Sequence, residues 1–150
     1  MQVKKWMTRN PISISEHTLL PEAYRILREY EIRHLPVTSE SGRVVGLISD
    51  HDIGQRLISR IEEDSLSSDS LSSKRENSAT TARDIMSVNL QTVGPEESIV
   101  VAALLMHNRK IGCLPVLTAN NVLVGILTTN DLLEILVSLL SNGALEGRVG

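Results

Sequence analysis

Aromatic residues are almost missing from this chain of 150 residues, which contains one Trp, two Tyr and no Phe. Any core must therefore be aliphatic, and the 41% of hydrophobic residues suffices for one ordinary domain or two small ones. The chain also lacks a basic block and has a formal net charge of -3. Without a positive field or aromatic side chains on which bases could stack, a nucleic-acid-binding protein is not expected.

Cysteine and long apolar runs are scarce as well. Cys113 is the single cysteine, which excludes an intrachain disulfide and a cluster of thiolate zinc ligands. The longest apolar run, residues 99–106, is far too short for a transmembrane helix. Met1 is followed by Gln-Val-Lys-Lys rather than by the apolar stretch of a signal peptide. We therefore expect a cytoplasmic protein with no membrane partner.

The most informative feature that is present is an internal repeat. Residues 3–61 align with residues 82–140 without a gap, and many positions are identical, among them the pairs Met7/Met86, Pro36/Pro115, Gly46/Gly125 and Asp52/Asp131. A gapless match through strands, turns and helices is hard to obtain by chance, so the sequence indicates a duplication.

Each repeat predicts the order strand, helix, strand, strand, helix. In the first repeat the alternation of apolar residues predicts a strand over 11–15, and Thr18 is the expected cap of the following helix. Two strands, 32–38 and 43–48, flank a hairpin turn at 40–42, and a second helix starts at about Asp50.

The predicted organisation is a first repeat over 1–61, a linker over 62–81, a second repeat over 82–140 and a tail over 141–150 that frays. The linker is dominated by Ser with mixed charge, so we expect it to be flexible. The helices of the second repeat are apolar almost all round, which predicts burial against the other repeat or another subunit.

Two strand-to-helix junctions carry the candidate chemistry, GLISDHD (46–52) and GILTTND (125–131). In each, a hydroxyl residue (Ser49 or Thr128) precedes an aspartate (Asp52 or Asp131) by three positions. One interpretation is a capping box, which needs no ligand. The other is a ribose-phosphate site, because a helix N-terminus and a hydroxyl favour phosphate whereas a carboxylate accepts hydrogen bonds from paired ribose hydroxyls.

Three motifs in the same order in both copies resemble a known family. MTRNPISI, IRHLPV and GLISDHD, with MSVNLQTV, IGCLPV and GILTTND in the second copy, are similar to cystathionine-β-synthase (CBS) domains. The resemblance covers residues 3–61 and 82–140. It implies an α+β fold in which two tandem β-α-β-β-α repeats pack about a pseudo-twofold axis, the arrangement called a Bateman module.

The resemblance also implies two nucleotide-binding clefts, each walled by both repeats. In each cleft the hydroxyl and Asp of one copy hold ribose and phosphate, and the first strand of the other copy contacts the base. Carried over, the first cleft would comprise Ser49, Asp52, Leu47, Arg33, His34, His51, Ser87, Leu90, Thr92 and Ile111. The second would comprise Thr128, Asp131, Ile126, Thr8, Pro11, Ser13, Ile32 and Cys113.

The implied ligand is an adenine nucleotide, AMP, ADP or ATP, with S-adenosylmethionine and NADH as further members of the class. Family members often carry a basic side chain just before the L-P-V strand, where the first repeat has Arg33 and His34 and the second has Gly112 and Cys113. We therefore expect the first cleft to favour the more phosphorylated ligand. His51 stands where the family often has Arg or Lys, so this preference should depend on pH.

No catalytic set is visible in the sequence: it contains no nucleophile paired with a base, no carboxylate pair and no metal ligand set. The prediction is a non-enzymatic regulatory sensor that acts on a separate effector protein and forms a homodimer through its helices. The alternative is a structural or dimerisation module in which the clefts are vestigial and the capping interpretation is correct.

Overall fold

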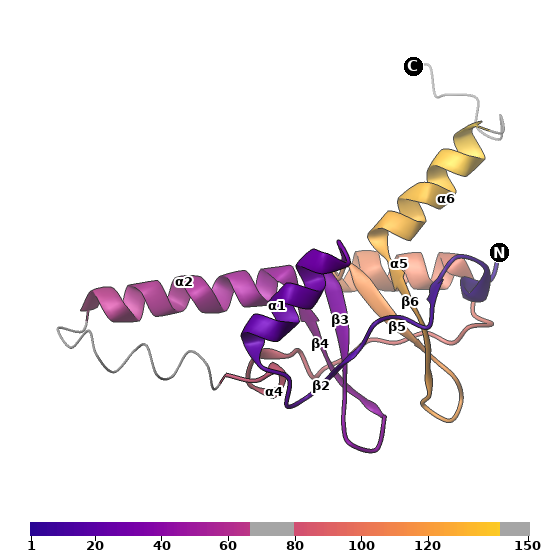
Figure 1. The fold of residues 1–150 in the computed structure, drawn as a ribbon. Coiled ribbons are helices and arrows are strands. Elements are labelled where there is room, and N and C mark those ends of the chain that lie inside the picture. Colours follow the sequence, from indigo (N-terminus) through magenta and orange to yellow (C-terminus); the bar gives the residue numbers. More distant parts are fainter. Residues whose placement is uncertain (67–79, 142–150) are drawn as a thin grey trace, which may run out of the picture. The chain divides into compact units, whose positions relative to one another are not determined.

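The computed structural model (Figure 1) describes residues 1–66 and 80–141. The chain divides into two compact units. Unit 1 consists of Met1–Asn10 together with Gln91–Gly150, and unit 2 consists of Pro11–Leu90. Each unit contains a three-stranded sheet.

Unit 2 is a small sheet with helices. Its elements are β2 (Ile14–Ser15), α1 (Leu20–Glu29), β3 (His34–Thr38), β4 (Val44–Ser49), α2 (Asp50–Leu66) and the short helix α4 (Ala82–Ile85). Strand β2 runs parallel to β3, and β3 and β4 form an antiparallel hairpin. The hairpin turns at Gly42, whose φ of 77° lies in the left-handed region that favours glycine. On the other edge of the sheet, Ser87 pairs with Leu47 of β4.

Unit 1 repeats this arrangement. Its elements are the 3-10 turn η1 (Val3–Lys5), β1 (Thr8–Arg9), α5 (Ile99–Arg109), β5 (Cys113–Leu117), β6 (Leu123–Thr128) and α6 (Thr129–Ser141). The strand order is β1-β6-β5. On the edge of β5 that faces away from β6, Val93 forms a parallel bridge to Val116. The predicted order of strands and helices is therefore confirmed in both copies, although the first strand of the second copy is reduced to this bridge.

The first residues of each repeat belong to the unit of the other repeat. Thr8 precedes the first repeat's own strands, yet β1 pairs with β6 in the register Thr8 to Ile126. Ser87 belongs to the second repeat by sequence, yet its N–H and C=O exchange hydrogen bonds of 2.9 and 3.1 Å with Leu47. The sequence repeats and the compact units therefore do not contain the same residues, because each sheet is completed by the leading segment of the other copy.

This exchange explains two of the identical pairs found in the repeat. A Cβ added at Gly46 would overlap the Sδ and Cγ atoms of Met86 and would lie 2.9 Å from its Cβ. A Cβ added at Gly125 would overlap Met7 in the same way and would lie 3.1 Å from the carbonyl oxygen of Thr8. Glycine is thus needed at both positions because a methionine of the leading segment crosses the strand there.

Both cores are aliphatic, as the composition predicted. The buried core of unit 2 is formed by Ile14, Leu20, Ala23, Leu27, Leu35, Val37, Ile48, Ile53 and Ala82. The buried core of unit 1 is formed by Val3, Val93, Ile99, Ala102, Met106, Leu114, Val116, Leu127 and Ile135. Val3 and Ala82, each fully buried, anchor the two leading segments to these cores.

The predicted cap of the first helix is wrong. Helix α1 begins after Leu19 and has no side-chain cap hydrogen bond, with a proline in its first turn. Thr18 lies one residue too early because its backbone is used elsewhere. Its N–H donates to Ser15 O at 3.0 Å and its C=O accepts from Ala82 N at 2.8 Å, so Thr18 helps to hold the leading segment of the second repeat.

The two ends of the predicted linker are regular in structure. Residues 62–66 continue α2, and Thr81 is the N-cap of α4. Thr80 is buried, and its carbonyl accepts a hydrogen bond of 2.9 Å from Leu20 N. Residues 67–79 and 142–150 lie outside the described part of the chain, so the flexibility of the linker and the fraying of the tail stay predictions.

The contact between methionine and glycine predicts an unusual sensitivity at Gly46. Gly46→Ala should destabilise the protein by about 1–3 kcal/mol, because the new methyl group overlaps Met86 close to its backbone. The matched control is Gly54→Ala, since a Cβ at this helical position has no neighbour within 4 Å. That change should stabilise by roughly 0.5–1 kcal/mol. Urea unfolding measures both, and equal effects of the two substitutions would contradict the packing argument.

Candidate functional site

The first candidate corner lies where β4 ends and α2 begins in unit 2. The N–H and the hydroxyl of Ser49 both donate to Asp52 Oδ2 at 2.7 Å. In return, Asp52 N donates to Ser49 Oγ at 3.2 Å. Both residues are half-buried. The carboxylate therefore closes the first turn of α2 in the manner of a capping box.

The second corner, between β6 and α6 in unit 1, has the same geometry. The N–H of Thr128 donates to Asp131 Oδ2 at 2.6 Å, and its hydroxyl donates to the same oxygen at 2.8 Å. In both corners only Oδ2 takes part in these bonds. Among the residues that the structure describes, Oδ1 of Asp52 and of Asp131 accepts no hydrogen bond, so one oxygen of each carboxylate could accept from a ligand hydroxyl.

A third corner of this kind, which the sequence analysis missed, lies at α4. The N–H and hydroxyl of Thr81 donate to Asp84 Oδ2 at 2.7 and 2.9 Å. These hydrogen bonds, first the backbone one, hold the pKa of Asp84 below its ordinary value. The sequence signal was T-A-R-D, a hydroxyl residue followed three positions later by an aspartate at a helix start. Because this corner is a capping box outside the repeated motif, the geometry of the hydroxyl and the carboxylate alone does not define a binding site.

The strand neighbours distinguish the two repeated corners from this cap. In unit 2, His34 of β3 pairs with Ser49, and Leu47 pairs with Ser87. In unit 1, Cys113 of β5 pairs with Thr128, and Ile126 pairs with Thr8. Each repeated corner therefore has a residue from the leading segment of the other copy near it, paired with the strand that ends at the corner.

Some of the predicted cleft residues are divided between the two units. Unit 2 contains Ser49, Asp52, Leu47, Arg33, His34, His51, Ser87 and Leu90 of the first set, whereas Thr92 and Ile111 belong to unit 1. Unit 1 contains Thr128, Asp131, Ile126, Thr8 and Cys113 of the second set, whereas Pro11, Ser13 and Ile32 belong to unit 2. The two complete clefts thus stay a prediction, and the residues within one unit define the candidate corners.

The basic side chain expected at the first corner is already paired. Arg33 Nε donates to Asp50 Oδ2 at 3.1 Å, while the Arg33 side chain remains 70% exposed. The other oxygen, Asp50 Oδ1, accepts from His51 N at 2.9 Å. Asp50 was not among the predicted site residues. The sequence signal for Asp50 was a carboxylate directly after Ser49 in the predicted strand-to-helix turn, and only the structure shows that it faces Arg33.

His34 lies half-buried between these charges. Burial is the largest influence and lowers the pKa of its imidazole below the ordinary value of 6.5, although the Asp50 carboxylate acts in the opposite direction. His34 is therefore neutral at pH 7. It can donate or accept a hydrogen bond, but it adds no positive charge to the corner.

Cys113 occupies the corresponding place at the second corner. Its thiol is buried, and burial, followed by the nearby Asp131 carboxylate, raises its pKa to about 12. The thiol is thus protonated at pH 7. In this state Cys113 acts as a small apolar residue beside Thr128.

Comparison with known proteins places the chain in a family. The family model described as CBS domain matches residues 3–58 and 82–138. A CBS domain-containing protein of Dictyostelium discoideum is 31% identical over 92% of each chain. The homoserine O-acetyltransferase of Methanocorpusculum labreanum is 30% identical over 88% of this chain but only 23% of its own length, so the chain spans about a quarter of that relative. The chain belongs to the CBS domain family.

Solved structures agree with this assignment. The CBS domain pair of protein MJ0100, solved with 5′-methylthioadenosine and S-adenosyl-L-methionine, has a TM-score of 0.75 at 26% identity and covers 92% of this chain and 97% of its own. CBSX2 in complex with AMP has a TM-score of 0.74 at 25% identity and likewise covers 92% of this chain and 97% of its own. The predicted tandem CBS pair is therefore confirmed.

The burial of His34 predicts how this side chain titrates. We expect the midpoint of its imidazole C–H resonance in an NMR pH titration to fall below 6.5, with His34→Gln identifying the signal. Because its pKa is lower in the folded state, His34 should favour folding above about pH 6.5 and reduce stability as the pH falls below that value. A midpoint above 6.5 would show that the carboxylates, rather than burial, control His34.

Proposed function

We propose that this chain is a non-enzymatic regulatory module that binds an adenosine derivative at the Ser49/Asp52 and Thr128/Asp131 corners. Membership of the CBS family supports this, as do two similar CBS proteins whose structures hold AMP, or 5′-methylthioadenosine and S-adenosyl-L-methionine. Binding of the ligand would change how the module acts on a separate effector protein. The activity of the longer homoserine O-acetyltransferases is not assigned to this chain.

The observation that carries the proposal is that one carboxylate oxygen at each corner takes no part in the hydrogen bonds of the cap. Asp52 and Asp131 each use Oδ2 for the cap, so Oδ1 is placed to accept a hydrogen bond from a ribose hydroxyl. Ser49 and Thr128 would then face the 5′ substituent of the ligand. The adjacent strand positions Leu47 and Ile126 would offer an apolar contact to the base.

A structural role is the second candidate, and the Thr81/Asp84 corner favours it. That corner shows that the same hydrogen bonds form at a helix start where no ligand is expected. If the repeated corners serve only as caps, the module would act through its surfaces and bind no nucleotide. The two candidates differ in what the loss of an aspartate does in the presence of ligand.

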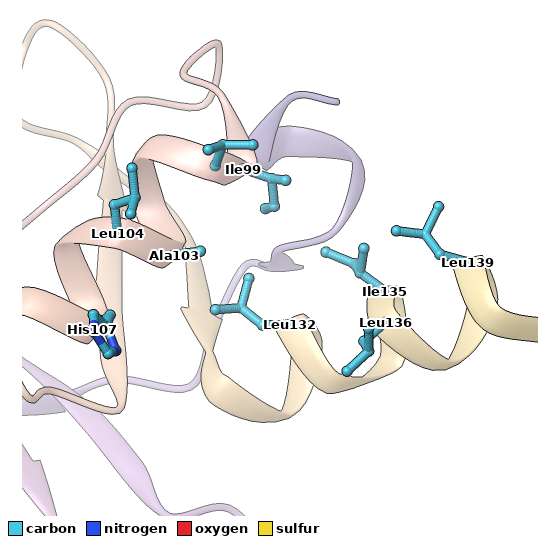
Figure 2. Close-up of a pocket in the computed structure, with 9 residues that line it drawn as sticks. Ile99, Ala103, Leu104, His107, Leu132, Ile135, Leu136 and Leu139 are labelled. Atoms are coloured by element: carbon cyan, nitrogen blue, oxygen red, sulfur yellow. The ribbon is translucent and has the colours of Figure 1, made fainter. Parts of the chain in front are cut away.

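The surface of unit 1 supports self-association in either case. Helices α5 and α6 border an open apolar groove, and Figure 2 shows side chains of both helices pointing into it. The groove is lined by Ile99, Val100, Ala103, Leu104, His107, Leu132, Ile135, Leu136 and Leu139. Between and beyond these groove residues of α6, Leu133, Val137 and Leu140 are about half exposed or more. Exposed aliphatic surface of this extent is characteristic of an interaction site.

We propose a second copy of this chain as the partner of that groove. No helix in residues 1–66 or 80–141 has the length and hydropathy needed to cross a membrane. The two helices that border the groove carry charges of both signs, with Arg109 at the end of α5 and Asp131 and Glu134 in the first turns of α6. A surface that is apolar at its centre and carries both signs at its edge can complement itself across a twofold axis.

The ligand proposal predicts a thermal shift that depends on the two aspartates. A true ligand among AMP, ADP, ATP, NADH and S-adenosylmethionine, present at about a hundred times its dissociation constant, should stabilise the wild-type protein by roughly 2.7 kcal/mol. Asp52→Ala and Asp131→Ala should each lose the part contributed by its own corner. The double substitution should lose the whole ligand-dependent increment.

The Thr81/Asp84 corner provides the control for this experiment. Asp84→Ala removes the same cap hydrogen bonds, so it should lower stability without ligand and keep the full ligand increment. An equal ligand increment in the wild type and in the Asp52→Ala, Asp131→Ala double variant would refute the assignment of the corners. No shift with any of the five compounds would favour the structural candidate.

The apolar groove between α5 and α6 predicts that the protein forms a dimer and that one charged substitution in the groove disrupts it. Leu136→Glu places a carboxylate in the apolar lining, so sedimentation at tens of micromolar protein should show a dimer for the wild type and a monomer for the variant. Val122→Glu is the matched control, because Val122 is 55% exposed in the β5–β6 turn of the same unit. A wild-type monomer, or an unchanged Leu136→Glu dimer, would contradict the proposed interface.

A further inference from the structure

Arg33 and Asp50 form an ion pair at the Ser49/Asp52 corner, and the Thr128/Asp131 corner has no equivalent pair. Arg33 lies just before β3, and Asp50 is the first residue of α2, directly after Ser49. Besides the 3.1 Å bond from Arg33 Nε to Asp50 Oδ2, the backbone N–H of Asp50 donates to Arg33 O at 3.1 Å. The aligned positions in unit 1 are Gly112 and Thr129, so the cation and the carboxylate are both missing there. Their joint presence at one corner indicates that they act together.

Asp50 changes the electrostatics of the first corner. The charged groups that act on His34 beside this corner are Asp50, Arg33 and Asp52, so two carboxylates stand against a single cation. His34 does not restore the balance, because its half-buried imidazole is neutral at pH 7. The corner is therefore negative, despite the basic residue that led us to expect a preference for phosphate.

The helix start is also less open to an anion than the sequence suggested. A phosphate at a helix N-terminus binds through backbone N–H groups that have no partner within the helix. At α2, the N–H of Ser49 donates to Asp52 and the N–H of His51 donates to Asp50. Two of the donors that a phosphate would use are thus occupied by carboxylates of the chain itself.

We propose that the Ser49/Asp52 corner selects adenosine derivatives whose 5′ substituent is uncharged or cationic, and that Asp50 is the residue that disfavours a 5′-phosphate. This inference rests on the proposed function, since it names the ligand class of the same corner. It reverses the expectation from sequence that Arg33 and His34 make this the corner for the more phosphorylated ligand. Asp50 acts by pairing Arg33, by occupying a helix N–H and by adding its own negative charge.

The test compares two ligands that share the nucleoside and differ in the 5′ group, AMP and 5′-methylthioadenosine. Isothermal titration on an Asp131→Ala background reports on the Ser49/Asp52 corner. We expect this protein to bind 5′-methylthioadenosine at least as tightly as AMP. Asp50→Asn frees Arg33 and removes one negative charge, so it should tighten AMP binding by about five- to tenfold and leave 5′-methylthioadenosine within about twofold. Arg33→Ala in the Asp50→Asn protein should abolish that gain.

Glu40→Gln is the control for net charge, because Glu40 is exposed in the β3–β4 turn of the same unit and should change neither affinity. A preference for AMP of tenfold or more before Asp50 is changed would overturn the inference and leave the proposed function intact. An unchanged ratio of the two affinities in Asp50→Asn would overturn the role of Asp50. Failure of both ligands to bind would overturn the inference, and the absence of a thermal shift with every compound of the panel as well would refute the proposed function.

Discussion

The exchange of leading segments is the constraint on which the rest of the structure depends. A two-stranded hairpin is marginal by itself in water, and each repeat adds only a short strand or a single bridge on one edge. The other edge is filled by Thr8 or Ser87 from the opposite copy, with Met7 or Met86 crossing a glycine. Because the buried Val3 and Ala82 fix these segments to their cores, neither repeat forms its compact unit from its own residues alone. The duplication is thus a structural requirement as well as a record of ancestry.

The candidate site follows from the same exchange. The strands that receive the leading segments, β4 and β6, are the strands that end at Ser49 and Thr128. The pairing of these strands with the leading segments therefore suffices to bring a residue of the other copy close to each corner. The hydroxyl and the aspartate first serve the fold, since the same bonds form at Thr81 and Asp84. Ligand binding would be a second use of a cap, made possible by the carboxylate oxygen that the cap leaves over and by the strand next to it.

The two copies have diverged mainly in what they expose. In the first, charged residues surround the corner, and the ion pair between Arg33 and Asp50 lies at its surface. In the second, the corner has no such pair, and the divergence is found in α5 and α6, where Val100, Leu104 and Val137 are more than half exposed. This divergence agrees with the two proposals made above, discrimination of a small ligand in unit 2 and contact with another chain in unit 1.

The sequence by itself determined the duplication, the order of strands and helices, the aliphatic cores and the repeated hydroxyl and aspartate, because these depend on residue periodicity and on contacts within a few positions. The cap at Thr18 was predicted wrongly, since a tertiary hydrogen bond to Ala82 decided the conformation there. Three further facts required the tertiary structure: which copy supplies each edge strand, that burial lowers the pKa of His34, and that Asp50 faces Arg33. Each depends on residues distant in sequence that only the folded chain brings together, and a local pattern contains no record of such partners.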